Sequence, residues 1–144
     1  MRTFVYPAKF SNDGHGRILV RFPDLKEAVT DGKDLAEAME QAIDCVGSDL
    51  AHRMFHKEDI PAASPVKRGH RGIPVPFWIA PKLALYLAMR ERNLSNSELA
   101  RRLGVTETVV RRMLNPDHET KAEKIQAALA LLGQRLAVDV QDAA

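Results

Sequence analysis

Residues 96–115 read NSELARRLGVTETVVRRMLN, and this stretch decides how the second half of the chain is organised. Ala100, Gly104 and Val110 have the offsets of a helix-turn-helix, in which two short helices cross after a tight turn. A small side chain is needed where the helices cross, and glycine adopts the positive φ of the turn at little cost. We therefore expect one helix on each side of Gly104, the second capped by Thr106. The other expected core positions are Leu99, Leu103 and Val105.

The polar side chains of this stretch are candidates for contacts with DNA. The first residues of a recognition helix face base edges, where arginine can bind guanine, glutamate can accept from cytosine and threonine can meet the thymine methyl group. Arginines on the preceding helix can reach phosphates, or can serve only solubility. The candidate DNA-binding residues are Asn96, Arg101, Arg102, Thr106, Glu107, Thr108, Arg111 and Arg112. A helical hairpin with no role in DNA binding is the alternative.

Charge is unevenly distributed along the chain, although the 144 residues have a net charge of only +2. Residues 1–65 carry 8 basic and 11 acidic side chains, a net charge of −3. Residues 66–115 carry 10 basic and 3 acidic side chains, a net charge of +7, and residues 116–144 have a net charge of −2. A basic block that contains the expected helix-turn-helix indicates a polyanionic partner. A solvated arginine-rich surface would show the same charges.

The composition is that of a globular protein, with 45% hydrophobic and 28% charged residues. It excludes disordered, collagen-like and coiled-coil chains. Cys45 is the one cysteine, which excludes an internal disulfide and a cysteine-based zinc site; we expect it to be a small buried side chain. No apolar run approaches the ~18–20 residues of a membrane span. Without a signal-peptide pattern, we expect a cytoplasmic protein and no membrane partner.

The first third of the chain alternates between apolar and polar residues as strands do. Residues 3–10 and 17–22 alternate on either side of the turn cluster 12–16, which predicts a β-hairpin. A short third strand fits residues 27–30. A capping box, DLAE, then opens a helix over about 35–56. Strands and a helix with opposed periodicities predict an α+β layer in which the helix covers one sheet face.

Residues 60–72 interrupt both periodicities and predict a linker, because they combine prolines with a basic, glycine-spaced stretch. Alternation resumes at 73–79 with two interspersed prolines, which is typical of an edge strand returning to the first sheet. We therefore expect one domain over 1–79 and a second over 80–144.

The second domain is expected to be helical up to Gly133. Pro81 suits the first turn of a helix. Further capping boxes at 95–98 and 120–123 open two more helices, the last of which ends at Gly133. Leu136, Val138 and Val140 alternate and predict a terminal strand over 134–140. Such a strand can join its own domain or pair across a two-fold axis, since operators usually need dimers.

The chain resembles the HicB antitoxin family of toxin–antitoxin systems, with a C-terminal Xre-like helix-turn-helix. The resemblance covers nearly the whole chain. The segments that carry it are Tyr6-Pro7-Ala8, Asp13-Gly14, Val20 to Leu25, Ala28 to Gly32, Ala36-Glu37-Ala38, Ile60-Pro61 and Ser64-Pro65. Two stretches depart from the family pattern, His15-Gly16-Arg17 and the basic Lys67 to Arg71.

This resemblance implies a degenerate RNase H-like first domain and a helix-turn-helix second domain. Together with the periodicities above, it predicts an α+β fold: an RNase H-like βββαβ domain, followed by an all-α helix-turn-helix domain with a terminal strand. It implies that the first domain neutralises a cognate HicA-type toxin, an mRNA interferase, by covering its active site. It also implies that the second domain binds operator DNA and represses the operon. Because operators usually need dimers, we expect a homodimer or tetramer. A stand-alone helix-turn-helix regulator with a ligand-sensing first domain is the alternative.

No residue pattern points to catalysis or to a cofactor. RNase H chemistry needs carboxylates that converge on Mg²⁺, and the candidates are Asp13, Asp24, Asp31 and Asp34. We place Asp13 in a turn, Asp24 at a strand end and Asp34 at a helix cap, and we expect none of the four to lie mid-strand and point at a shared metal ion. His52 and His56 share a helix face but lack the Glu of a zincin. We expect a protein that is not an enzyme and binds no metal, while a divergent metal-dependent nuclease is a further alternative.

Overall fold

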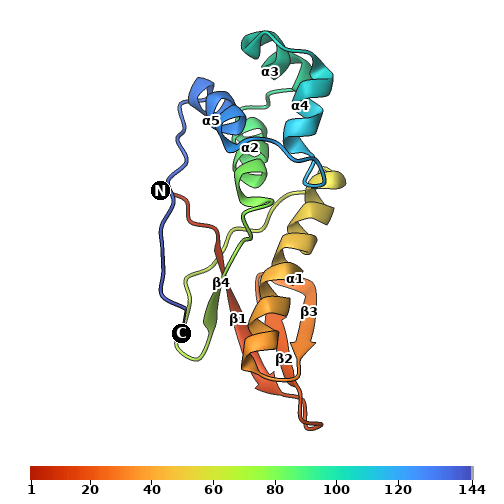
Figure 1. Ribbon diagram of the computed structural model, residues 1–144, viewed down its shortest axis with the longest axis vertical. Helices are drawn as coiled ribbons and strands as arrows, with labels where there is room; N and C mark the ends of the chain where they lie inside the picture. Colours follow the sequence, from red (N-terminus) through yellow and green to blue (C-terminus); the bar gives the residue numbers. More distant parts are fainter. Residues whose placement is uncertain (144) are drawn as a thin grey trace. The chain divides into compact units, whose positions relative to one another are not determined.

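The computed structural model describes residues 1–143 and has a mixed α+β fold, which confirms the expected class. The chain divides into two compact units, Met1–Ala80 and a second that begins at Pro81. The first contains a four-stranded sheet and one long helix, and the second contains short helices (Figure 1). Within the described residues, none of the helices has the length and apolar character needed to cross a membrane.

The sheet of the first unit is antiparallel throughout. Its strands are β1 (Val5–Asn12), β2 (Ile18–Phe22), β3 (Leu25–Gly32) and β4 (Arg71–Pro74), in the order β3-β2-β1-β4. The predicted hairpin is confirmed as β1 paired with β2, where Phe10 lies opposite Val20. The third strand is longer than predicted, because its pairing with β2 continues to both ends around a bulge at Arg21 and Phe22.

The predicted strand over 73–79 is wrong in its bounds, although it does return to the edge of the sheet beside β1. Strand β4 begins at Arg71 and stops at Pro74. After Pro76, the N–H groups of Ile79 and Ala80 donate to the Pro76 carbonyl oxygen, which makes a turn instead of a strand. Two prolines in this stretch cannot donate to a neighbouring strand, which explains the early end.

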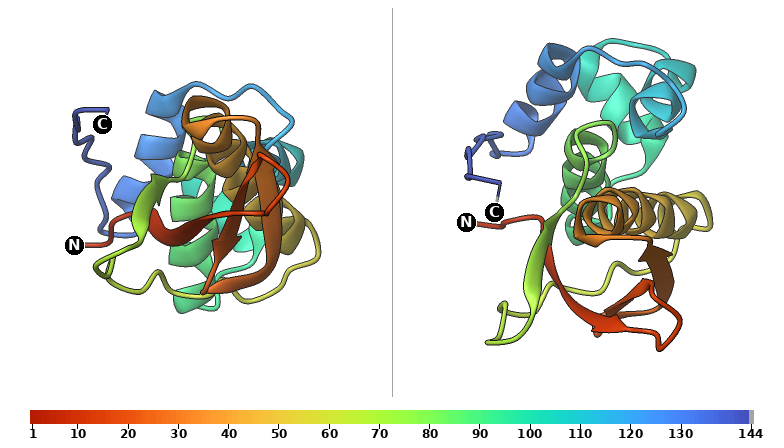
Figure 2. Two further views of the ribbon diagram at one scale, coloured as in Figure 1. Left: turned by 90° about the horizontal axis from the view of Figure 1, so that it is seen from below. Right: turned by 60° about the horizontal axis from the view of Figure 1, so that its bottom comes forward.

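Helix α1 (Leu35–Phe55) covers one face of the sheet, as Figure 2 shows. The Asp34 side chain accepts from the Glu37 N–H at 2.9 Å, as the capping box predicts. The Glu37 carboxylate accepts from the N–H of Lys33 rather than from that of Asp34. The buried stripe of the helix consists of Ala38, Ala42, Val46, Gly47, Leu50 and Met54. Small residues on this stripe let the helix lie close to the strands.

The second unit contains helices α2 (Ala80–Glu91), α3 (Asn96–Leu103), α4 (Glu107–Leu114) and α5 (Ala122–Leu131). Pro81 lies in the first turn of α2, as predicted. The capping box expected at Thr120 does not form, because Lys121 is the N-cap residue of α5 and makes no side-chain cap bond. Gly133 has a φ of 75°, in keeping with the predicted helix end.

The predicted terminal strand over 134–140 is wrong within this chain. The described residues that follow Gly133 form neither helix nor strand. Val138 and Val140 are 70% and 89% exposed. Alternation gives a segment the pattern of a strand, but a strand needs a neighbour for its backbone groups, and the described chain offers none here.

Candidate nucleic-acid interface

Two capped helices and a three-residue connection build the candidate interface. The Ser95 hydroxyl accepts from the N–H of Glu98 at the start of α3. Gly104 ends α3 with a φ of 70°, where the positive φ itself, not a lack of space, requires glycine. Thr106 then caps α4 by accepting from the N–H of Val109. These local bonds fix both helix ends as predicted from the sequence.

The predicted packing residues of α3 and α4 are largely buried. Ala100 is 4% exposed and Val110 is fully buried, and the two helices contact each other. Leu99 and Met113 complete the buried face of the pair. Val105 differs from the prediction, because it is 38% exposed in the connection and does not fill the core.

The candidate DNA-binding residues face solvent. Seven of them are exposed and Asn96 is half-buried; the exposed ones are Arg101, Arg102, Thr106, Glu107, Thr108, Arg111 and Arg112. On α3, Arg101 and Arg102 both bind the Glu98 carboxylate, and the bond from Arg101 is the main reason that the pKa of Glu98 is lowered. The two arginines of α3 therefore share one counter-charge.

The two arginines of α4 differ in their surroundings. The Arg111 guanidinium lies 3.7 Å from the Glu107 carboxylate and donates to the Thr108 hydroxyl at 3.2 Å. The Arg112 guanidinium has no ion pair within residues 1–143. Arg112 therefore offers the more available cation of this pair for an external anion.

Sequence reasoning missed Lys82, which is buried in α2 and donates to backbone oxygens at the end of α4. The sequence did contain a signal. Helix α2 is buried on most sides, so a lysine within its apolar run PKLALYLAM has to find partners inside the unit.

The four carboxylates considered as metal ligands each make a separate contact within the first unit. Asp13 accepts from the N–H groups of His15 and Arg17 in the β1–β2 turn. Asp31 binds the Arg17 guanidinium at 2.9 Å, and this bond is the main cause of the lowered pKa of Asp31. Asp24 accepts from both the N–H and the hydroxyl of Ser64, and Asp34 caps α1. Among residues 1–143, no group of three potential ligands gathers around one point.

Other polar groups of the first unit lie on α1 and at its end. Glu40 and Asp44 are exposed and one helical turn apart. The His52 and His56 rings lie 4.3 Å apart, centroid to centroid, in a tilted arrangement.

On β1, the buried Tyr6 hydroxyl donates to the Pro61 carbonyl oxygen at 2.6 Å, and burial raises the pKa of Tyr6 to about 12.

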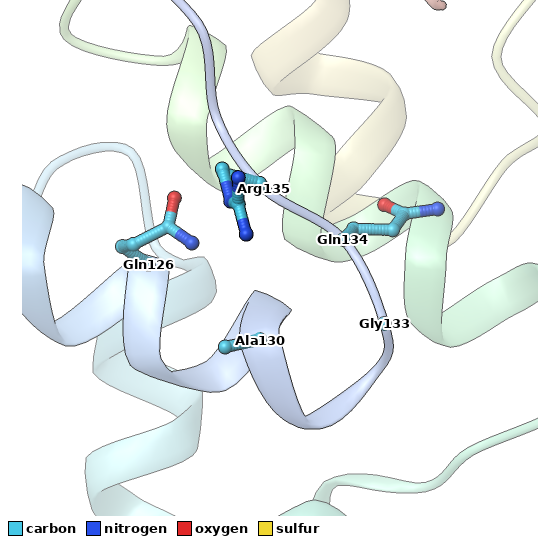
Figure 3. Close-up of a pocket in the computed structure, with 5 residues that line it drawn as sticks. All are labelled: Gln126, Ala130, Gly133, Gln134 and Arg135. Atoms are coloured by element: carbon cyan, nitrogen blue, oxygen red, sulfur yellow. The ribbon is translucent and has the colours of Figure 1, made fainter.

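A hollow of about 360 Å³ lies at the end of α5. Figure 3 shows its lining residues, Gln126, Ala130, Gly133, Gln134 and Arg135. The Gln126 side chain accepts from the N–H of Leu136 at 2.8 Å, which ties the start of the C-terminal segment to the helix. Among the described residues, those that line this hollow include no carboxylate, and their polar side chains are amides and one guanidinium.

Comparisons with known proteins show the family to which this chain belongs. A family model described as the HicB-like antitoxin of bacterial toxin–antitoxin systems matches residues 5–84. The chain is 34% identical to the protein named Antitoxin HicB of Escherichia coli (strain K12), over 92% of this chain and 96% of that protein. It is 36% identical to Antitoxin HicB 2 of Photorhabdus laumondii subsp. laumondii, over 91% of this chain and 92% of that protein. The chain therefore belongs to the HicB-like family of antitoxins of bacterial toxin–antitoxin systems.

Proposed function

We propose that this antitoxin has two activities, one in each unit. The first unit neutralises a cognate HicA-type mRNA interferase by covering its active site. The second unit binds operator DNA through an Xre-like helix-turn-helix made of α3 and α4, and so represses the operon. The observation that carries the second activity is the exposed row of polar residues on α4 above a buried Val110 and Met113.

The geometry of α4 supports a role as the recognition helix. Its first turn exposes Glu107 and Thr108, and its last turn exposes Arg111 and Arg112. Side chains at these positions can reach base edges in the major groove while the opposite face stays packed on α3. The arginines of α3 are placed on a neighbouring helix, where they can bind phosphates. A cationic surface of this kind gives affinity that falls as salt rises.

The acidic part of the first unit, residues 1–65, supports the proposed toxin contact, while Lys67, Arg68 and Arg71 bring the net charge of the whole unit to zero. Residues 1–65 have a net charge of −3, and α1 exposes Glu40 and Asp44 on its outer side. An RNA-cleaving toxin needs a basic surface for its substrate, so an acidic cover is complementary and speeds association. The element order β1-β2-β3-α1-β4 also supports the RNase H-like βββαβ arrangement that the family resemblance implies.

The proposed DNA binding also favours a homodimer or tetramer as the active form. One pair of short helices contacts a single half-site, and repressors of this kind commonly bind two half-sites with two copies. Sedimentation of the full chain at micromolar concentration would test this: a single species at the mass of one chain would contradict it.

Co-expression with a HicA-type toxin encoded beside this protein tests the proposed function. We expect the antitoxin to rescue growth and to co-purify with the toxin. A gel-shift titration with DNA from directly upstream of the gene pair should show a complex at concentrations where a scrambled duplex shows none. Rescue without operator binding would overturn the second activity alone. Operator binding without rescue would favour the stand-alone regulator.

A further inference from the structure

Lys82, in the first turn of α2, places a charged ammonium group inside the second unit. The residue is only 4% exposed. Its Nζ lies 3.1 Å from the carbonyl oxygen of Arg112 and 2.6 Å from that of Asn115, and it also donates to the carbonyl oxygen of His118. The Thr120 hydroxyl is a fourth neighbour, 3.2 Å away. One ammonium group thus joins the end of α4 to the segment that leads into α5.

All four neighbours of this cation are neutral oxygens. A lysine has three N–H donors and no acceptor, so each donor of Lys82 has an oxygen available. The last carbonyl groups of a helix have no partner within the helix and carry partial negative charge, which suits a buried cation. Burial lowers the pKa of Lys82, and the negative charge of Asp117 opposes that effect.

Neutral donors also reach the end of α4: the Asn115 N–H donates to the Arg112 carbonyl oxygen at 3.2 Å, and the Thr120 hydroxyl donates to the same oxygen at 3.4 Å. The charged donor at this oxygen is Lys82. The helix has eight residues, and its buried residues are Val110 and Met113. The segment 115–121 that follows contains turns but no helix or strand. Arg112 has its carbonyl oxygen bound to Lys82 and its side chain in solvent. Lys82 therefore binds the backbone of Arg112, the residue whose guanidinium is available for an external anion.

A second cation of the same unit makes a comparable contact elsewhere. Arg92, just after α2, donates to the carbonyl oxygen of Leu132 at 2.6 Å and to that of Ala88 at 3.1 Å. Leu132 is the C-cap residue of α5, a helix that carries none of the candidate DNA contacts. Arg92 therefore provides a matched control, because its loss disturbs a helix end in the same unit but not the end of α4.

We propose that Lys82 is a positioning residue for DNA recognition. By binding the carbonyl oxygens at the end of α4 and in the following segment, it fixes the direction in which Arg111 and Arg112 leave the helix. This inference rests on the proposed DNA binding by α4. It goes further than a role in stability, because it assigns to Lys82 the discrimination between operator and other DNA, which fold stability alone does not alter.

The test compares Lys82→Met with Arg92→Met in the full chain. Methionine keeps an unbranched apolar side chain at position 82 and removes the donors. Binding is titrated against the upstream duplex and against a scrambled duplex of the same composition, with concentrations corrected for the folded fraction. We expect Lys82→Met to lose about tenfold in operator affinity, the size of one misplaced base contact, while scrambled DNA changes by less than about twofold because phosphate contacts persist.

The control and a milder variant make the outcome decisive. Arg92→Met should leave the ratio of operator to scrambled affinity unchanged, even where it lowers stability. Thr120→Val keeps the ammonium but removes one of its neighbours, together with the bond from the Thr120 hydroxyl to the Arg112 carbonyl oxygen. It should lower the ratio by a smaller factor, so it replaces Lys82→Met if that variant does not fold. Amide hydrogen exchange of residues 113–121 should be faster in Lys82→Met and in Thr120→Val than in the wild type.

Two results would count against different parts of the account. Suppose that the wild type prefers the operator and that Lys82→Met and Thr120→Val keep the same ratio of operator to scrambled affinity. This result would overturn the positioning role of Lys82 and leave the proposed function intact. A wild type that binds both duplexes equally would contradict the proposed operator binding and, with it, this inference.

Discussion

The two units use their charged side chains in different ways. In the first unit, Asp13 and Asp34 fix a turn and a helix start, and Asp24 and Asp31 bind a linker serine and an arginine. In the second unit, the Arg112 guanidinium has no such partner among the described residues. The comparison teaches that a charged side chain indicates an external partner most clearly where it makes no ion pair or hydrogen bond within its own chain.

The largest expected effect is a loss of operator affinity in the second unit. Replacing both arginines of α4, Arg111→Ala with Arg112→Ala, should weaken operator binding by about 2–4 kcal/mol, because each can supply a base or phosphate contact. Arg112→Ala alone should cost more than Arg111→Ala, since Glu107 and Thr108 already hold Arg111. Gel-shift titration measures both. An undiminished affinity in the double variant would refute α4 as the recognition helix.

The same double variant should leave the antitoxin folded and able to neutralise its toxin. Exposed substitutions of this kind usually change stability by less than about 0.5 kcal/mol. Growth rescue by the double variant is the control, and its loss would mean that α4 also serves the toxin contact.

A smaller effect is expected from a close approach in the first unit. A Cβ atom at Gly47 would lie 2.6 Å from Pro76 and 2.7 Å from Trp78. Gly47→Ala should therefore destabilise the first unit by about 1–3 kcal/mol through overpacking. Urea unfolding followed by tryptophan fluorescence reports it, because Trp78 is the one tryptophan and lies at the contact. A variant as stable as the wild type would show that segment 75–79 shifts freely away from α1.

The next effect depends on pH. Because folding raises the pKa of Tyr6 from 10.0 to about 12, its stabilising contribution is complete below pH 10 and is lost as the pH rises toward 12. The loss should reach about 1 kcal/mol near pH 11. Absorbance of tyrosinate in a Tyr86→Phe variant follows Tyr6 alone, since the chain has two tyrosines. Titration near pH 10 in the folded protein would contradict the buried hydroxyl.

The smallest effect concerns the linker. Ser64→Ala removes the hydroxyl that donates to Asp24 at 2.7 Å but keeps the backbone N–H bond to the same carboxylate. One exposed hydrogen bond of this kind should contribute about 0.5 kcal/mol. Thermal unfolding of the variant checks this value. Operator affinity should be the same as in the wild type, and a change in it would show that the linker takes part in DNA binding.

Local signals in the sequence predicted the helix ends of the candidate interface and the β1–β2 hairpin. Gly104, Ser95 and Thr106 act through bonds within a few residues, so their spacing predicts the helix ends directly. The predicted terminal strand is wrong because the alternation of Leu136, Val138 and Val140 predicts a strand only if another strand lies beside it.

Long-range contacts explain the other differences. The Thr120 hydroxyl lies beside Lys82, 38 positions away, and donates to the carbonyl oxygen of Arg112 instead of capping α5. Lys82 itself is buried by packing that no local pattern describes. Whether the candidate residues bind DNA also depends on a second molecule, so that part stays a prediction.

The claim that the two units have separate activities is tested most directly with two charge variants of the full chain, each measured against both partners. One variant carries Glu40→Lys and Asp44→Lys on α1, and the other carries Arg111→Ala and Arg112→Ala on α4. Calorimetric titration with the purified toxin and with the upstream duplex gives four affinities. The account predicts that the α1 variant loses about tenfold or more for the toxin alone and the α4 variant loses at least as much for DNA alone. If either variant lost affinity for both partners equally, or for neither, two separate activities in the two units would be contradicted.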